Sequence, residues 1–311
     1  MSLLPPDGGE PISTGPIATG PIAAAERPEP AEPTPLGDAW HMFRRNRAAL
    51  AGLAVLLAIV LMTAAGPSLY PVDPFEIVSA PLLPPGSEGV PLGTDYLGRD
   101  ILAGIINGAR ASLAVGASAA ALTMAIGITI GALSGFYRGW VDQLLMRVTE
   151  FFHVLPPLLL AMALVTLFSP SLPTIAIAIG IVSWTAAARL TRAEFLRIGT
   201  LEYVLAARSI GARNRRLIWR VILPNALPPL IVSATLTVGV AILFESGLSF
   251  LGLGDPNVMS WGLMIGSNRT YMLDAWWAAT IPGIAIFLTV LSISLIGDGL
   301  NEALNPRLRQ R

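Results

Sequence analysis

The sequence contains no lysine, so all 20 of its basic residues are arginines. A phosphate-binding loop of the G-x-x-x-x-G-K-[ST] type needs its lysine to contact the β- and γ-phosphates of ATP. We therefore expect no conventional ATP site and no cofactor in this chain. Any ATP that serves it must be hydrolysed by a partner protein.

Cysteine is absent, and histidine occurs only at His41 and His153. These absences exclude disulfides and thiolate metal ligands, and they make a metal centre unexpected. The H-E-x-x-H pattern of metalloproteases and the G-x-S-x-G pattern of serine hydrolases are also missing. We predict that the chain is not an enzyme and has neither catalytic nor metal-binding residues.

Charge is scarce as well, because 13% of the residues are charged and 53% are hydrophobic, against about 25% charged in soluble domains. A membrane crossing takes about 20 apolar residues. Such segments occur at residues 48–72, 111–137, 221–244 and 275–297, and residues 150–189 are long enough for two crossings separated by a Pro-containing turn at 169–173. The sequence therefore predicts an all-α membrane protein with six transmembrane helices.

The arginines are distributed unequally between the two sides of these segments. One side holds sixteen of them between positions 44 and 311, whereas the other holds only Arg99, Arg110 and Arg269. Cytoplasmic flanks of membrane helices are enriched in arginine. Both termini and the polar segment 202–225 are accordingly expected in the cytoplasm.

Three regions follow from composition. Residues 1–37 are rich in proline, glycine, alanine and glutamate and are predicted to be a disordered cytoplasmic tail. Residues 38–110 are expected to hold a short interfacial helix, the first crossing and an external loop. Asp38 would cap that helix, and Trp40 and Phe43 would face lipid; the alternative is a simple basic flank. The external loop is either a functional element, as a cap over a pathway through the bundle or a platform for an external partner, or a folded connector. Residues 111–311 would form the remaining transmembrane domain, with a cytoplasmic loop at 189–225.

The cytoplasmic segment 202–225 has the local signals of a short helix followed by a return to the membrane. Thr200 is a candidate N-cap, and Glu202 would lie at the positive end of the helix dipole. Gly211 would end the helix in a left-handed conformation. A second helix over residues 213–222 would stop at Pro224. The alternative interpretation is an ordinary basic loop.

The spacing within this segment resembles the loop by which permeases of ABC importers contact their ATPases. The spacing of Ala206 and Ala207, then Gly211, then residues 221–224 matches the pattern A-A-x-x-x-G-x(9)-I-x-L-P, with Val221 at the isoleucine position. Residues 40–309 are similar to C-type permease subunits of dipeptide and oligopeptide ABC importers. The matching stretches are residues 92–95 and 97–100 (LGTD and LGRD), 108–110 (GAR), 202–229, 248–254 (LSFLGLG), 260–262 (SWG), 297–300 (GDGL) and 305–307 (NPR).

The resemblance implies a type I ABC importer transmembrane domain in the bacterial inner membrane. Its partners would be a homologous second permease, two cytoplasmic ATPase subunits that bind ATP and Mg, and an external substrate-binding protein, with no nucleic acid. The chain would move di- or oligopeptides inward by alternating access. The coupling residues would be Glu202, Tyr203, Leu205, Ala206, Ala207, Arg208, Gly211, Leu223 and Pro224.

Two alternatives remain open for function: the same machine importing another cargo such as nickel, and a stand-alone secondary transporter. The latter needs ionisable residues inside the membrane, and Glu245 is the one firm candidate. Glu245 either lines the substrate pathway and meets a peptide ammonium, or pairs within the bundle or caps a helix break at Gly247. Trp184 is a second pathway candidate, although helix packing explains it equally well.

Overall fold

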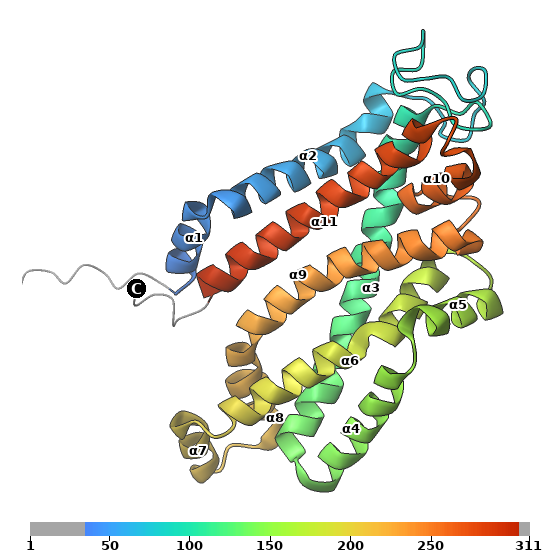
Figure 1. Ribbon diagram of the computed structural model, residues 1–311. Helices are drawn as coiled ribbons and strands as arrows, with labels where there is room; N and C mark the ends of the chain where they lie inside the picture. Colours follow the sequence, from blue (N-terminus) through green and yellow to red (C-terminus); the bar gives the residue numbers. More distant parts are fainter. Residues whose placement is uncertain (1–34, 305–311) are drawn as a thin grey trace, which may run out of the picture.

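The computed structural model describes residues 35–304, which are almost entirely helical (Figure 1). Most of the predicted tail, at residues 1–34, lies outside the described residues. Helix α2 lies along α11, and α9 packs against α11, α3 and α6. The long helices run roughly side by side between two ends of the molecule, one carrying α10 and the segment after α2, the other carrying α7 and the start of α4.

The N-terminal helix α1 (Pro35–Arg45) precedes α2 (Arg47–Leu69). Because α1 begins at Pro35, Asp38 lies inside it, and the predicted cap at Asp38 is wrong. Phe43 is 5% exposed and packs with Ala49 and Ala303, so it faces α11 rather than lipid. Trp40 is exposed and stacks on Phe43. The helix thus attaches to the bundle through one of the two predicted aromatic residues.

Within residues 35–304, five helical segments are long and apolar enough to cross a membrane: α2, α3 (Ile101–Tyr137), α6 (Leu172–Ile198), Asn214–Leu253 and α11 (Trp276–Leu304). The third predicted crossing is instead a pair, α4 (Gly139–Val154) and α5 (Pro157–Phe168), bent by 86°. The bend falls at the paired prolines Pro156 and Pro157, the N-cap and first residue of α5. The predicted break at 169–173 is confirmed, because α6 begins at Leu172 behind the Ser171 cap.

A row of glycines on α3 brings this helix close to α6. Gly127, Gly131 and Gly135 recur every fourth residue, and all three are buried. A Cβ at Gly131 would lie 2.6 Å from the Cβ of Thr191, and one at Gly135 would lie 2.7 Å from that of Phe195. Small residues at this spacing allow membrane helices to approach closely. The pair α3–α6 consequently forms the most extensive contact between two elements in the bundle.

The segment after α2 is compact and packs on α10 (Trp261–Asn268) and α11 (Figure 1). The indole Nε1 of Trp277 donates to the backbone oxygen of Thr94 at 3.3 Å, and the backbone N–H of Tyr96 donates to Asn268 Oδ1 at 3.2 Å. Burial raises the pKa of Asp95, against the lowering effect of backbone N–H groups and of the Arg99 charge. Helix α3 already begins at Ile101, so residues 101–110, the end of the predicted region 38–110, are its first part.

Candidate functional site

The predicted coupling segment contains helix α7 (Glu202–Ser209), which stands apart from the long helices at the end of α6 (Figure 1). Leu201 has an extended backbone immediately before it, and Glu202 lies in its first turn. The Thr200 hydroxyl donates to the backbone oxygen of Arg197 and does not cap α7, so the predicted Thr200 cap is wrong. The predicted short helix itself is confirmed.

Helix α7 is held to the bundle by one apolar side chain. Val204 is fully buried in a cluster that includes Phe195, Ile198 and Ile222. The guanidinium of Arg208 also lies over the ring of Phe136, 5.9 Å from its centroid. A cation near an aromatic face is attracted to it by the ring quadrupole. Both contacts fix α7 to the ends of α3, α6 and η1, the π-helix Leu217–Ile222 that leads into α9.

The opposite side of α7 is open. Ile210, immediately after it, is 86% exposed, and Tyr203 and Leu205 are 46% and 47% exposed. Of the remaining predicted coupling residues, those exposed are Glu202, Ala206, Arg208, Gly211 and Pro224, and those half-buried are Ala207 and Leu223. The segment therefore presents apolar area next to small alanines, a surface suited to close contact with another protein.

The end of α7 is a glycine-dependent turn. Gly211 has φ of +82°. Its N–H donates to the oxygen of Arg208 at 3.0 Å, and the N–H of Ala212 donates to the oxygen of Ala207 at 3.1 Å. This pair of bonds is the Schellman arrangement, in which a left-handed residue closes a helix C-terminus. The role predicted for Gly211 in ending the helix is confirmed.

The chain returns to the bundle through α8 (Asn214–Arg216) and η1 and then continues as α9 (Leu223–Leu248). The prediction that a helix stops at Pro224 is wrong, because Pro224 lies in the first turn of α9. The ring is tolerated there because its missing N–H falls where the helix changes from π to α hydrogen bonding. Leu223 and Pro224 thus belong to the base of α9 and not to α7.

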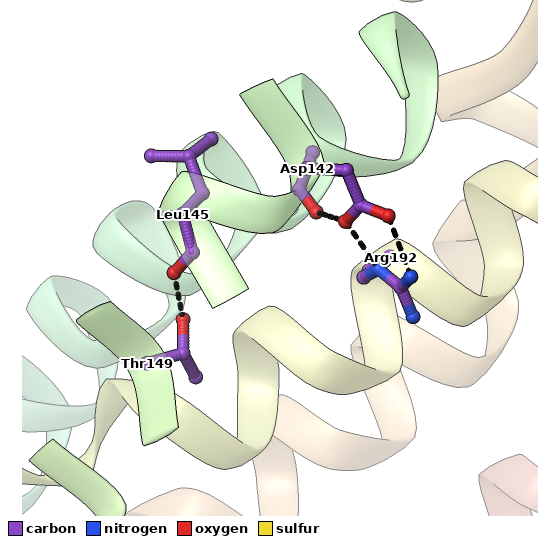
Figure 2. Close-up of polar contacts among 5 residues, drawn as sticks. Asp142, Leu145, Thr149 and Arg192 are labelled. Carbon is purple, nitrogen blue, oxygen red and sulfur yellow. Dashed lines mark hydrogen bonds and ion pairs between the residues drawn. The ribbon is translucent and has the colours of Figure 1, made fainter. Parts of the chain in front are cut away.

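An ion pair near the same end of the molecule was not predicted from the sequence. Arg192 on α6 donates from Nε and Nη2 to the two carboxylate oxygens of Asp142 on α4, both at 2.6 Å (Figure 2). The Ser134 hydroxyl at the end of α3 donates to the same carboxylate. Three helices therefore meet at Asp142. A separation of 50 residues gives no local signal for such a pair.

A hollow of about 320 Å³ lies beside this ion pair and is lined by Met146, Thr149, Glu150, Arg189 and Arg192. The Thr149 hydroxyl is turned to the backbone of its own helix, where it donates to the oxygen of Leu145 (Figure 2). Arg189 contacts both ring nitrogens of His153 at 3.2–3.4 Å. The cleft between α4 and α6 is thus bordered by charges of both signs.

The two predicted pathway residues are closed off in this conformation. Glu245 is fully buried, and its Oε1 accepts from the hydroxyls of Ser249 at 2.9 Å and Ser260 at 2.8 Å, with Ser112 at 3.4 Å from Oε2. This arrangement matches the alternative in which Glu245 is held within the bundle. Trp184 is 4% exposed and packs against Phe152. Contact of either residue with a substrate stays a prediction.

The helical bundle and the projecting α7 define a multi-pass membrane permease, and comparisons with known proteins agree. Residues 127–310 match the family described as binding-protein-dependent transport system inner membrane component. Residues 34–85 match the N-terminal transmembrane domain of oligopeptide transport permease C. The chain belongs to this family of inner-membrane components of binding-protein-dependent transport systems.

The similar proteins include curated permeases from several bacteria. The di/tripeptide transport system permease protein DppC of Pseudomonas aeruginosa is 43% identical over 292 residues, covering 92% of this chain and 96% of that protein. The dipeptide permease DppC of Bacillus subtilis is 40% identical over 279 residues, covering 88% and 86%. The glutathione permease GsiD of Pectobacterium atrosepticum is 39% identical over 279 residues, covering 89% and 92%.

A solved structure supports the fold. A chain of the MetNI methionine ABC transporter in inward-facing conformations aligns with a TM-score of 0.57 and 20% identity, covering 65% of this chain and 96% of that one. The predicted type I ABC importer fold is therefore confirmed. Five single-helix spans and the bent pair α4–α5 account for the six predicted crossings.

Proposed function

We propose that this chain is a membrane-spanning subunit of an ATP-driven importer of di- or oligopeptides. The observation that carries the proposal is the 43% identity over 292 residues to a di/tripeptide permease, with nearly the whole of both chains aligned. Several other relatives at 37–40% identity are also named as dipeptide permeases. Nickel or another cargo and a stand-alone secondary transporter have no comparable support.

The proposed orientation places both termini and α7 in the cytoplasm and the compact segment after α2 outside. The arginine distribution supports it, because cytoplasmic flanks of membrane helices collect basic residues. The two regions lie at opposite ends of the bundle (Figure 1). In this orientation the exposed side of α7 faces cytoplasmic proteins.

In the proposed mechanism, two cytoplasmic ATPase subunits bind ATP and Mg, and one of them receives α7 in a groove. The exposed Tyr203, Leu205 and Ile210 supply apolar contact area, while Ala206 permits close approach. Because Val204 fixes α7 to the bundle, movement of the ATPases displaces the long helices as well. Alternating access further requires that α7 bind the two ATPase states with different free energies.

A homologous second permease and an external binding protein complete the proposed complex. A 12-residue helix spans about 18 Å, and a bilayer core is about 30 Å thick, so α5 alone does not reach across it. A second permease would enclose the pathway beside this incomplete crossing. The external binding protein would deliver peptide to the side that carries α10.

The proposal is tested by purifying the complex from its native membrane and identifying the chains that accompany it. Ile210→Asp places a charge on the exposed end of α7, and Gly211→Arg forces a bulky side chain into a left-handed backbone. Leu273→Asp is the matched control, because Leu273 is 98% exposed near α10 at the other end. We expect two ATPases and a second permease with wild type and control, and loss of the ATPases with both α7 variants.

Cargo is tested with the intact complex in vesicles, supplied with its binding protein and ATP. Uptake of a labelled dipeptide, in preference to free amino acids and nickel, is the expected result. Recovery of the chain alone in every purification contradicts the proposal that it is a subunit of an ATP-driven importer. Recovery of the complex without peptide uptake contradicts the proposal that its cargo is a peptide.

A further inference from the structure

A cluster of arginines surrounds a hollow at the base of α9. The hollow measures about 400 Å³, and its lining consists of Arg213, Arg215, Arg216, Trp219 and Arg220. No acidic residue contributes to it. The ion pairs found within residues 35–304 involve other arginines, Arg147, Arg192 and Arg197.

Four guanidinium groups on eight consecutive residues repel one another unless an anion lies among them. Guanidinium groups donate planar pairs of hydrogen bonds that match the oxygens of a phosphate. The composition of the lining therefore favours a phosphate-bearing ligand over a neutral or cationic one.

Helix geometry accounts for this convergence of arginines. The π-helix η1 buries Leu217 and Ile222 against the bundle while Trp219 and Arg220 stay exposed. π-helical turns appear frequently at functional sites. The polar residues of α8 and η1 are thus displayed on the outside of the turn that leads into α9.

Exposed apolar side chains follow the hollow at the start of α9. Trp219 is 62% exposed, and Leu227 and Ile231, one helical turn apart, are 40% and 42% exposed. Tryptophan is enriched at membrane–water interfaces. A ligand with a charged head and a long apolar tail fits both features, whereas a soluble anion uses only the first.

We propose that the hollow binds the phosphate head group of an anionic membrane lipid, with the acyl chains lying against the exposed apolar side chains at the start of α9. Basic pockets at the cytoplasmic ends of membrane helices are suited to such head groups. The assignment of the hollow to the inner leaflet rests on the orientation proposed above. The lipid occupies the base of the helix that follows α7, so it stabilises the junction between the coupling segment and the bundle.

The test uses the intact complex in mixed micelles that contain phosphatidylglycerol or phosphatidylcholine, with the lipid retained after washing measured by mass spectrometry. Arg215→Gln with Arg216→Gln removes two charges from the lining. Arg44→Gln with Arg45→Gln removes two exposed charges from α1 and is the matched control. Arg215→Lys with Arg216→Lys keeps the charges and removes the paired hydrogen bonds.

We expect wild type and the α1 control to retain phosphatidylglycerol over phosphatidylcholine. The glutamine variant should retain about thirtyfold less of it, since each of the two interfacial arginines contributes about 1 kcal/mol. The lysine variant should fall between them and show that the loss is not caused by misfolding. Millimolar inorganic phosphate should leave the retained lipid unchanged.

Three results overturn the proposal. An equal loss of retained phosphatidylglycerol in the α1 control attributes the loss to overall surface charge. Displacement of the lipid by inorganic phosphate assigns the hollow to a soluble anion. Release of the ATPase subunits with lipid retention unchanged assigns the arginines to a protein interface. The amount of retained lipid is measured without a transport assay. It can therefore be interpreted even if the complex does not import peptides.

Discussion

The carboxylate of Asp142 at the start of α4 and the guanidinium of Arg192 on α6 are joined by two hydrogen bonds of 2.6 Å (Figure 2). Their side chains are 17% and 34% exposed. The pair Arg147–Glu150 on α4 is far more open, at 85% and 69% exposed, with a separation of 3.8 Å. The first pair connects two helices, whereas the second lies within one helix.

A double-mutant cycle should separate these two pairs. With Asp142→Asn and Arg192→Gln, singly and together, we expect a coupling energy of about 1 kcal/mol, because residues in one partly shielded network couple measurably. The cycle on Arg147→Gln and Glu150→Gln should give a coupling close to zero, as exposed pairs do. Thermal unfolding of the detergent-solubilised complex provides the measurement. Equal coupling in both cycles contradicts a role for Asp142 in holding α4 to α6.

The glycine row on α3 leads to a prediction about packing. A Cβ at Gly131 would meet the Cβ of Thr191 at 2.6 Å and the backbone N of Arg192 at 2.9 Å, so Gly131→Ala should push α3 and α6 apart. We expect a loss of about 1–3 kcal/mol, typical of overpacking. Gly239→Ala on α9 is the control, because the nearest atom would lie 3.4 Å from its new Cβ. A similar thermal midpoint for the two variants contradicts the close-contact interpretation.

The sequence predicted features that depend on neighbouring residues. The helix break before Leu172 and the left-handed end at Gly211 both have local causes and were predicted from the sequence. The glycine spacing on α3 was also visible, but without the fold nothing indicated that α6 packs against it.

The sequence-based predictions were wrong or incomplete where tertiary contacts or competing local hydrogen bonds determine the structure. Thr200 has the chemistry of an N-cap, yet its hydroxyl donates backward to Arg197. Pro224 was expected to end a helix, but it falls in the first turn of a new one. The ion pair of Asp142 with Arg192 and the anchoring of α7 by Val204 need residues distant in the chain, and no single-sequence signal pairs them.

The compact segment between α2 and α3 should show a pH-dependent stability that depends on Asp95. Its Oδ1 accepts from the backbone N–H groups of Leu97 and Arg99, at 2.8 and 2.9 Å, and burial raises its pKa above the ordinary value. Because the folded-state pKa is the higher one, the folded state binds the proton more tightly. Its stability should therefore fall as pH rises from the unfolded-state pKa through the raised one.

Two substitutions test this relationship. Asp95→Asn keeps an oxygen that accepts both N–H groups and carries no charge, so it should match wild type at pH 4 and be at least as stable at pH 7. Asp95→Ala leaves both donors without their acceptor and should lose about 1–3 kcal/mol at either pH. Thermal midpoints of the purified complex at the two pH values are the measurement. An Asn variant less stable than wild type at pH 7 contradicts the predicted sign.

Glu245 allows the bundle and pathway hypotheses to be separated experimentally. The carboxylate is fully buried and accepts from Ser249 and Ser260, which brings the end of α9 against the start of α10. Glu245→Leu removes every acceptor from these hydroxyls and should destabilise the complex by about 1–3 kcal/mol. Glu245→Gln keeps one acceptor oxygen, and the serine hydroxyls can rotate to accept from its amide, so the loss should be smaller.

Transport measurements with the glutamine variant complete the argument. If Glu245 is held within the bundle, the apparent affinity for free dipeptides and for N-acetylated dipeptides should change equally or not at all. A carboxylate that binds the peptide ammonium interacts only with the free amino group, and its loss would weaken uptake of free peptides selectively. A selective loss of free-dipeptide uptake, normalised to the amount of folded complex, would show that Glu245 contacts the substrate. Such contact requires a second conformation in which α9 and α10 separate.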